Sequence, residues 1–206
     1  MKKTAMWLAV FLVCGAAMAQ DYGSEVRFGL DYAFPGAGDF DLYDSGLGFG
    51  VQYRNWIGDP LGYGVSIGWA EWDTDSGGTD IGGDVLGDFD GSVTLIPLGV
   101  SGLYKLADFA DWKVTLEAGL KYVLADSGIS AVHFVGGRED DLDISDGVVG
   151  VIGADYERNV GTEWSWFVGA VYQFDLQKGE IEVDHGNLRD NELQAFLLRA
   201  GAAFSF

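Results

Sequence analysis

Apolar side chains alternate with small or polar ones over segments of about ten residues, and this period of two constrains the fold more than any other feature. A β-strand points successive side chains to opposite faces, so the alternation predicts strands with one apolar face and one polar face. The regular segments are 26–34, 47–54, 61–69, 112–122 and 164–175, and the less regular ones are 93–104, 148–157 and 196–206. The sequence therefore predicts an all-β fold of about eight strands.

The segment around Pro97 changes phase. Val93 and Leu95 fit one face of a strand, whereas Leu98 and Val100 fit the other. A proline within a strand often marks a β-bulge, because it has no N–H to give to the ladder. We therefore predict a bulge at Pro97.

The links between these segments alternate in length. Short links lie near 55–60, 106–111 and 159–163, and long links lie near 35–45, 73–90, 126–146 and 177–191. Short turns on one side and long loops on the other are typical of an antiparallel up-and-down barrel that spans an outer membrane. We expect an eight-stranded transmembrane β-barrel rather than a soluble sandwich.

In a membrane barrel the apolar face meets lipid, and the polar face lines a narrow interior that side chains fill. Glycine, serine and charged residues dominate the second face here, and the chain contains 32 glycines. A cation that faced lipid at the midplane would cost roughly 2–4 kcal/mol, so we expect these charges to pair inside the barrel. The opposite arrangement, a lipocalin-like periplasmic binder with its apolar face inside, is the alternative. The predicted interior charge network is structural and comprises Arg27, Asp31, Arg54, Lys113, Glu117, Lys121, Asp155, Glu157 and Arg199.

Aromatic residues gather at the ends of the predicted strands. Tryptophan and tyrosine favour the interface between membrane and water, because their rings are apolar but carry a polar edge. We expect interfacial girdles formed by Tyr32, Phe34, Tyr53, Trp69, Tyr104, Trp112, Tyr122, Tyr156, Trp164 and Phe206.

The first 19 residues have the three parts of a secretory signal peptide. They start with Lys2 and Lys3, continue with an apolar run over 5–16 and end with a small-x-small site at 17–19. We expect cleavage after Ala19, which leaves residues 20–206 as the barrel. The chain's one cysteine lies in this leader, so the mature protein would hold no disulfide or thiolate site. A single membrane helix and a lipoprotein signal are the alternatives.

The end of the chain resembles a known family. Phe206 closes an alternating strand with Phe204 two positions before it, and this looks like the C-terminal strand by which outer-membrane barrels are handed to their assembly machinery. The segments 92–98 and 116–122 also resemble the outer-membrane β-barrel domain family, the small eight-stranded group that includes OmpX-like and OmpA-barrel-like proteins. The resemblance covers the whole mature chain as a pattern. It implies a place in the bacterial outer membrane and contact with lipid and lipopolysaccharide, but no single activity, because the family is functionally mixed.

Acidic residues concentrate in the long links, and the formal net charge of the chain is −20. This charge excludes binding to nucleic acid through a general basic surface. Carboxylates are ligands for calcium, but the stretch at 73–78 lacks the closing glutamate of a calcium loop. We therefore expect a solvated loop surface with no metal and no cofactor. A weak contact with lipopolysaccharide through divalent cations is the alternative.

The two histidines, His133 and His185, both fall in predicted long links. Ser130 precedes His133 by three positions and Asp184 lies beside His185, but neither set matches the His-Ser-Asn pattern associated with lipid A deacylase barrels. The leading hypothesis is a non-enzymatic outer-membrane barrel whose long acidic loops face the outside and serve surface contact with an unidentified extracellular ligand, or envelope integrity. A lipid-A-modifying enzyme and a narrow channel for small solutes are the alternatives.

Overall fold

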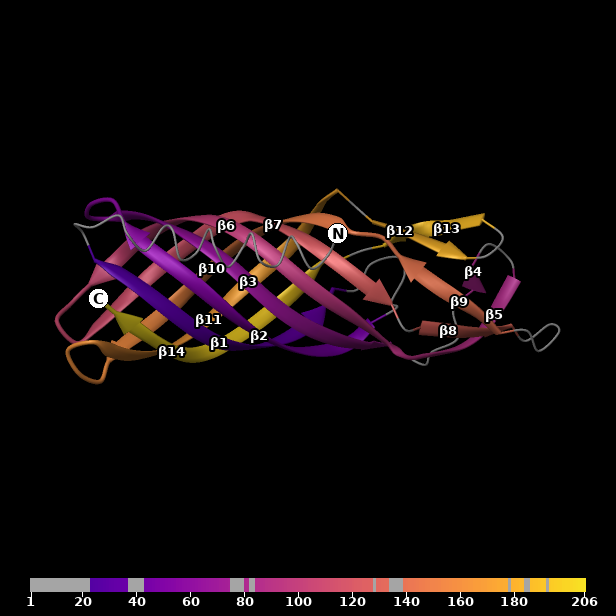
Figure 1. Ribbon diagram of the computed structural model, residues 1–206, viewed down its shortest axis with the longest axis horizontal. Helices are drawn as coiled ribbons and strands as arrows, with labels where there is room; N and C mark the ends of the chain where they lie inside the picture. The colour runs from indigo at the N-terminus through magenta and orange to yellow at the C-terminus, as the bar shows by residue number, and fades with distance from the viewer. Residues whose placement is uncertain are drawn as a thin grey trace.

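The main feature of the protein is a closed β-barrel of eight strands (Figure 1). The computed structural model describes residues 23–36, 43–74, 80–81, 84–127, 129–133, 139–177, 179–183, 186–191 and 193–206. The barrel strands are β1 (Ser24–Pro35), β2 (Tyr43–Trp56), β3 (Leu61–Thr74), β6 (Ser92–Asp108), β7 (Trp112–Ser127), β10 (Gly147–Asn159), β11 (Trp164–Gln177) and β14 (Ala195–Ser205). Consecutive barrel strands pair antiparallel, and β1 pairs with β14 from Glu25↔Ser205 to Pro35↔Ala195. This pairing leaves the barrel without an open edge, and it confirms the predicted eight-stranded antiparallel barrel.

The two ends of the barrel differ. At one, here called the turn end, residues 57–60, 109–111 and 160–163 link consecutive strands. At the other, here called the sheet end, the long links form a second sheet in the order β13-β12-β9-β8-β5-β4, which extends past the barrel (Figure 1). Its strands are β4 (Asp80–Ile81), β5 (Asp84–Asp90), β8 (Ile129–His133), β9 (Glu139–Ile144), β12 (Gly179–Val183) and β13 (Gly186–Asn191). The acidic links contain strands because backbone N–H and C=O groups pair whatever side chains the segment carries.

Large apolar side chains cover the outside of the barrel between its ends. Leu30 is 70% exposed, Leu47 65% and Val100 59%. A continuous apolar belt on a barrel wall is stable against lipid and unfavourable against water. The described part of the chain contains no helix long and apolar enough to cross a membrane.

The aromatic side chains predicted at the strand ends lie at outward positions of the barrel strands. Tyr104, Trp164 and Phe206 are examples, and each is exposed. Tyr53 alternates with the inward Gln52 and Arg54, so its position also faces outward. Its side chain is covered nevertheless, and its hydroxyl lies 3.1 Å from Ser24 Oγ.

The predicted bulge at Pro97 is also wrong. The register of β6 with β7 runs unbroken from Val93↔Ser127 to Lys105↔Thr115 and shifts only past Lys105. Val93 and Leu95 are in phase with Pro97 along the strand, and both are buried in the barrel interior. The change of phase in the sequence therefore marks a change in which face is apolar, and the strand itself is continuous.

This change of face occurs where the barrel approaches the sheet end. Trp72 of β3 and Ala125 of β7 point inward and are buried, whereas their outward neighbours Glu71, Asp73 and Asp126 are exposed. An apolar inside with a polar outside is the arrangement of a barrel in water. The same strands are thus patterned for lipid along most of their length and for water near the sheet end.

Candidate functional site: the barrel lumen

The lumen has three layers along the barrel axis, each made by inward side chains at one level of the wall. Nearest the turn end is an ion-pair plug, followed by a small mid-lumen cavity and then by an apolar upper lumen. The plug consists of Glu25, Arg27, Arg54, Lys113, Glu117, Asp155, Glu157 and Arg199. The upper lumen is a buried cluster that includes Ala33, Tyr43, Trp72, Val93, Leu95, Val123, Ala125, Val149, Val151, Val171 and Leu197.

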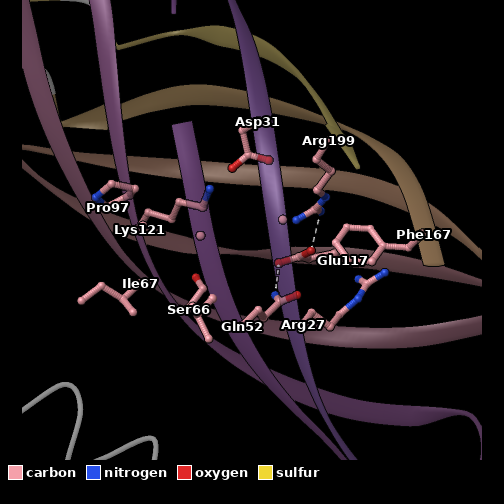
Figure 2. A pocket seen from close by; sticks show the side chains of 14 residues that line it. Arg27, Asp31, Gln52, Ser66, Ile67, Pro97, Glu117, Lys121, Phe167 and Arg199 are labelled. Carbon is pink, nitrogen blue, oxygen red and sulfur yellow. Dashed lines mark hydrogen bonds and ion pairs between the residues drawn. The ribbon is translucent and has the colours of Figure 1, made fainter. Parts of the chain in front are cut away.

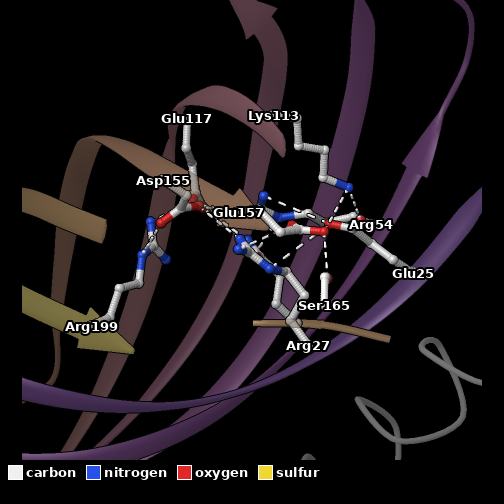
Figure 3. Close-up of polar contacts among 10 residues, drawn as sticks. Glu25, Arg27, Arg54, Lys113, Glu117, Asp155, Glu157, Ser165 and Arg199 are labelled. Carbon is white, nitrogen blue, oxygen red and sulfur yellow. Dashed lines mark hydrogen bonds and ion pairs between the residues drawn. The ribbon is translucent and has the colours of Figure 1, made fainter. Parts of the chain in front are cut away.

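Asp155 of β10 is the centre of the plug. Its Oδ2 accepts hydrogen bonds from Arg27 Nη1 at 2.7 Å and from Arg54 Nη2 at 2.6 Å, and its Oδ1 accepts one from Arg199 Nε at 2.8 Å (Figure 3). The three arginines stand on β1, β2 and β14. One carboxylate therefore joins four strands across the interior.

Glu117 of β7 is a second junction. It accepts from Arg199 Nη2 at 2.6 Å, from Gln52 Nε2 at 2.9 Å and from Arg54 Nη2 at 3.3 Å. Arg54 Nε also donates to Gln52 Oε1 at 2.7 Å. Because Arg54 and Arg199 each bond both Glu117 and Asp155, the two carboxylates form one connected network.

The part of the plug nearest the turn end is built around Lys113. Its Nζ lies 2.5 Å from Glu25 Oε2 and 3.0 Å from Glu157 Oε1, and Ser165 Oγ donates to Glu157 at 2.6 Å. The guanidinium of Arg27 lies 3.6 Å from the centre of the Phe167 ring. With Ser165 and Phe167, β11 joins the strands that the plug connects.

The plug holds its charges away from water, and Arg54 is 0% exposed. Removing charges from water costs several kcal/mol per ion, which only dense pairing and hydrogen bonding offset. In the described structure five plug atoms lack a hydrogen-bond partner: Glu25 Oε1, Arg27 Nε, Arg27 Nη2, Arg54 Nη1 and Glu157 Oε2. Each lies 3.4–3.8 Å from an opposite charge, so these contacts are electrostatic rather than hydrogen-bonded.

Trp56 closes the plug on its turn side. Its side chain is 5% exposed, and Lys105 Nζ lies 4.5 Å from the ring centre. The ring packs on Gly62 of β3, where a Cβ would lie 2.7 Å from a ring atom. That distance is too short for any side chain, so the Trp56 position requires glycine at 62.

Strands β3 and β6 contribute no charged residue to the plug. Their pairing is also incomplete, because the register runs to Ile67↔Leu98 and resumes at Ala70↔Leu95. Gly68 and Trp69 therefore have no partner in the ladder with β6, at the level of Pro97. We call this part of the wall the β3–β6 seam; its described ladder is interrupted at the level of Pro97.

The mid-lumen cavity lies between the plug and the upper lumen and has a volume of about 60 Å³. Asp31 of β1 and Lys121 of β7 both line it (Figure 2). Neither makes an ion pair within 4.0 Å with any residue that the structure describes. Gly29, Gly50 and Gly68 form part of the wall and leave the space open.

The structure gathers seven of the nine predicted interior charges in the plug and places the other two, Asp31 and Lys121, in the cavity. Sequence reasoning missed Glu25, which is 1% exposed. Glu25 is in phase with Arg27, and this was the available signal, but it stands before the first apolar residue of its segment. Gln52 and Trp56 were missed as well, because neither carries a charge.

The expectation of a polar interior throughout is wrong for the upper lumen. There Val93, Val149 and Leu193 are 0% exposed inside the barrel. On β3 and β7 the outward neighbours at this level are exposed acids, whereas on β10, β11 and β14 they are apolar side chains such as Ile152, Tyr172 and Leu198. The alternation alone indicates two faces and does not say which one is inside.

Several predicted features lie outside the described residues. They include the leader with its cleavage after Ala19, and both His185 and Asp184. His133 and Ser130 lie on β8, but their side chains also fall outside the description. Among the described residues no group of three or more His, Cys, Asp or Glu is placed to hold a metal ion.

The C-terminal strand is an ordinary member of the barrel wall. The Phe206 N–H donates to the carbonyl of Ser24 at 2.9 Å, and the Phe204 and Phe206 rings stack with their centres 6.1 Å apart. Phe206 is exposed on the outer face at the turn end. Its role as an assembly signal stays a prediction.

No family model matches the sequence, and no curated protein matches it either. Solved structures do share its fold. OprG from Pseudomonas aeruginosa is 12% identical with a TM-score of 0.66, and the match covers 91% of this chain and 97% of that one. A major outer membrane protein from Thermus thermophilus is 18% identical with a TM-score of 0.54, covering 88% and 99%. Neisserial surface protein A is 14% identical with a TM-score of 0.53, covering 90% and 100%.

The chain has the fold of a small bacterial outer-membrane β-barrel. The exposed apolar belt on the barrel wall fits a lipid environment. At these identities the likeness establishes the fold and not an activity.

Proposed function

We propose that this outer-membrane barrel conducts no solute along its axis and has a structural and surface-contact role. The observation that carries the proposal is the plug. Its charged side chains come from five of the eight strands, and Ser165 of β11 bonds them, so that six strands meet in one network around Asp155, Glu117 and Glu157 (Figure 3). Trp56 closes the plug on its turn side. An interior this narrow, filled by paired charges and then by apolar side chains, supports a sealed lumen rather than a channel.

The surface contact is assigned to the sheet end. The six-stranded sheet stands beyond the barrel, and its segments carry many of the chain's acidic residues (Figure 1). A segment rich in carboxylates beyond the barrel would suit contact with cationic partners, or with lipopolysaccharide through divalent cations. We assign this end to the cell exterior and the turn end to the periplasm, as is usual for barrels with short turns on one side.

Planar-bilayer recording of the purified barrel tests the sealed lumen. We expect no conductance steps at any applied voltage, because buried ion pairs at 2.6–2.8 Å block the axis. Reproducible steps from the wild-type protein would overturn the proposal.

Cysteine labelling of intact cells tests the orientation. Asp73→Cys lies at the sheet end and Thr162→Cys at the turn end, and both positions are exposed. A membrane-impermeant maleimide should label only Asp73→Cys. Labelling of Thr162→Cys alone would reverse the assignment and remove the surface role from the sheet.

Two steps of biogenesis belong to the same proposal. The leader is removed after Ala19, and Phe204 and Phe206 present the last strand to the assembly machinery. Mass spectrometry of the mature protein gives its first residue directly. Removal of Phe206 should lower the amount of folded barrel in the outer membrane, whereas an equal amount of folded protein would argue against an assembly role.

A further inference from the structure

We propose that the mid-lumen cavity is a binding site for a small zwitterion of about the size of glycine, held between Asp31 and Lys121. This inference goes beyond the surface role and depends on the cavity alone.

The two charged side chains point into one space without meeting. Asp31 and Lys121 both line the cavity (Figure 2), and neither has an ion-pair partner within 4.0 Å among the described residues. The carboxylates and arginines of the plug make much closer contacts, down to 2.6 Å. Both side chains are half-buried, and Asp31 lies opposite Arg199 in the ladder, yet neither makes a close ion pair. A charge in a narrow lumen gains from a direct partner, and a ligand in the cavity can contact both groups.

The space itself is created by glycine. A Cβ added at Gly50 would meet nothing closer than 3.4 Å, so the wall has room for a side chain that the sequence omits. The cavity volume of about 60 Å³ is roughly twice the ~30 Å³ that one water occupies in the liquid. It therefore suits a molecule of a few non-hydrogen atoms.

Charge balance decides the class of ligand. The plug and the cavity together hold five cations and five anions, since Glu25 and Asp31 complete the anions and Lys121 the cations. A simple ion would add an unbalanced charge to this buried interior, which costs several kcal/mol. A zwitterion adds none, and its ammonium and carboxylate form charge-assisted hydrogen bonds with Asp31 and Lys121 respectively.

We expect ligand to exchange through the wall beside the cavity rather than through the plug. The β3–β6 seam lines the cavity through Gly68 and Pro97, lacks plug ion pairs and has a gap in its ladder. We expect exchange there to be slow, so ligand should be supplied while the barrel folds as well as afterwards.

The test is retention of glycine. The mature chain is refolded in detergent with isotope-labelled glycine, free ligand is removed, and retained glycine is counted by mass spectrometry after denaturation. We expect about one glycine per wild-type barrel. Acetate and methylammonium, which each carry one end of the zwitterion, should be retained at least ten times less.

Variants separate the site from general effects on folding. Asp31→Asn combined with Lys121→Met removes one charge of each sign, so the net charge of the interior is unchanged, and it should lower glycine retention at least tenfold. Gly50→Val should lower retention to the same extent, because its side chain fills the cavity. Gly102→Val is the matched control, because Gly102 is exposed on the outer face and a Cβ there meets nothing closer than 3.8 Å. Heat-modifiable gel mobility verifies that each variant folds. If wild type retains no more glycine than Gly50→Val, or if the double variant binds as well as wild type, the cavity holds water only and the proposal fails.

Discussion

The plug and the upper lumen are two layers of one interior, and different interactions stabilise the side chains buried in each. The plug keeps arginines and carboxylates from water by pairing them at 2.6–2.8 Å, whereas the upper lumen packs side chains such as Val93 and Leu95. The same eight strands build both layers. The medium outside the wall does not by itself explain the difference, because the outward neighbours of the upper-lumen residues are polar on β3 and β7 but apolar on β10, β11 and β14.

This comparison shows what each layer contributes. Each fully buried apolar side chain of the upper lumen adds about 1.5–3 kcal/mol to the free energy of unfolding. This contribution depends little on how the side chains are oriented toward one another. The plug adds less net energy, because desolvation opposes its ion pairs, but its geometry accepts only one set of partners. We infer that the plug sets the register between strands and that the upper lumen supplies the larger apolar stabilisation.

The largest effect is expected from breaking the plug at its centre. Asp155→Asn leaves three arginines without their shared carboxylate, and the free energy of unfolding should fall by about 3–5 kcal/mol. Urea unfolding of the refolded barrel, followed by tryptophan fluorescence, measures the loss. Asp111→Asn, at an exposed turn position, is the control and should change little. Equal stability of the two variants would contradict the role given to Asp155.

A smaller effect is expected from a cavity in the upper lumen. Leu95 is 3% exposed, and Leu95→Ala should cost about 2–3 kcal/mol from lost burial and an unfilled space. The matched variant Leu30→Ala truncates a side chain that is 70% exposed on the outer belt. Unfolding of both in the same detergent should show the larger loss for Leu95→Ala, and the reverse order would argue against a packed upper lumen.

The next largest loss of stability is expected from overpacking beside Trp56, which closes the plug on its turn side. The side chain added by Gly62→Val would clash with the Trp56 ring and displace it, which should destabilise the barrel by about 1–3 kcal/mol. A shifted Trp56 emission maximum would accompany the change. Gly102→Val, on the outer face, should leave both stability and emission unaltered; a similar effect in both variants would point to strand propensity instead of Trp56 contact.

The smallest effect is expected on the outside of the wall near the sheet end. Ser92 Oγ donates to Glu71 at 2.9 Å, but the pair is exposed. Glu71→Gln should change the free energy of unfolding by less than about 0.5 kcal/mol, in contrast to Asp155→Asn. A loss above 1 kcal/mol would show that this level of the barrel is not surrounded by water.

Much of the fold follows from local pattern. The alternation and the short turns predict eight antiparallel strands, and the inward phase of Arg27 and Asp155 follows once the belt is placed against lipid. Pro97 was misread for a simple reason. A pattern of period two states that a strand has two faces, but it does not state what lies opposite each face at each level of the barrel.

The pairing inside the lumen could not be predicted in the same way. Arg27, Arg54 and Arg199 meet Asp155 only because barrel closure brings β1, β2 and β14 around β10. These contacts span 44 to 128 residues in sequence, and local periodicity carries no information at that range.

The sequence by itself determined the eight barrel strands, their antiparallel order and the two faces of each strand, because these follow from the local alternation and the short turns. It did not reveal the second sheet formed by the long links. Only the tertiary structure decided that the lumen divides into a charged plug and an apolar upper lumen. It also decided that Glu25 completes the charge balance and that Asp31 and Lys121 face a cavity. Those outcomes depend on which side chains closure of the barrel brings together.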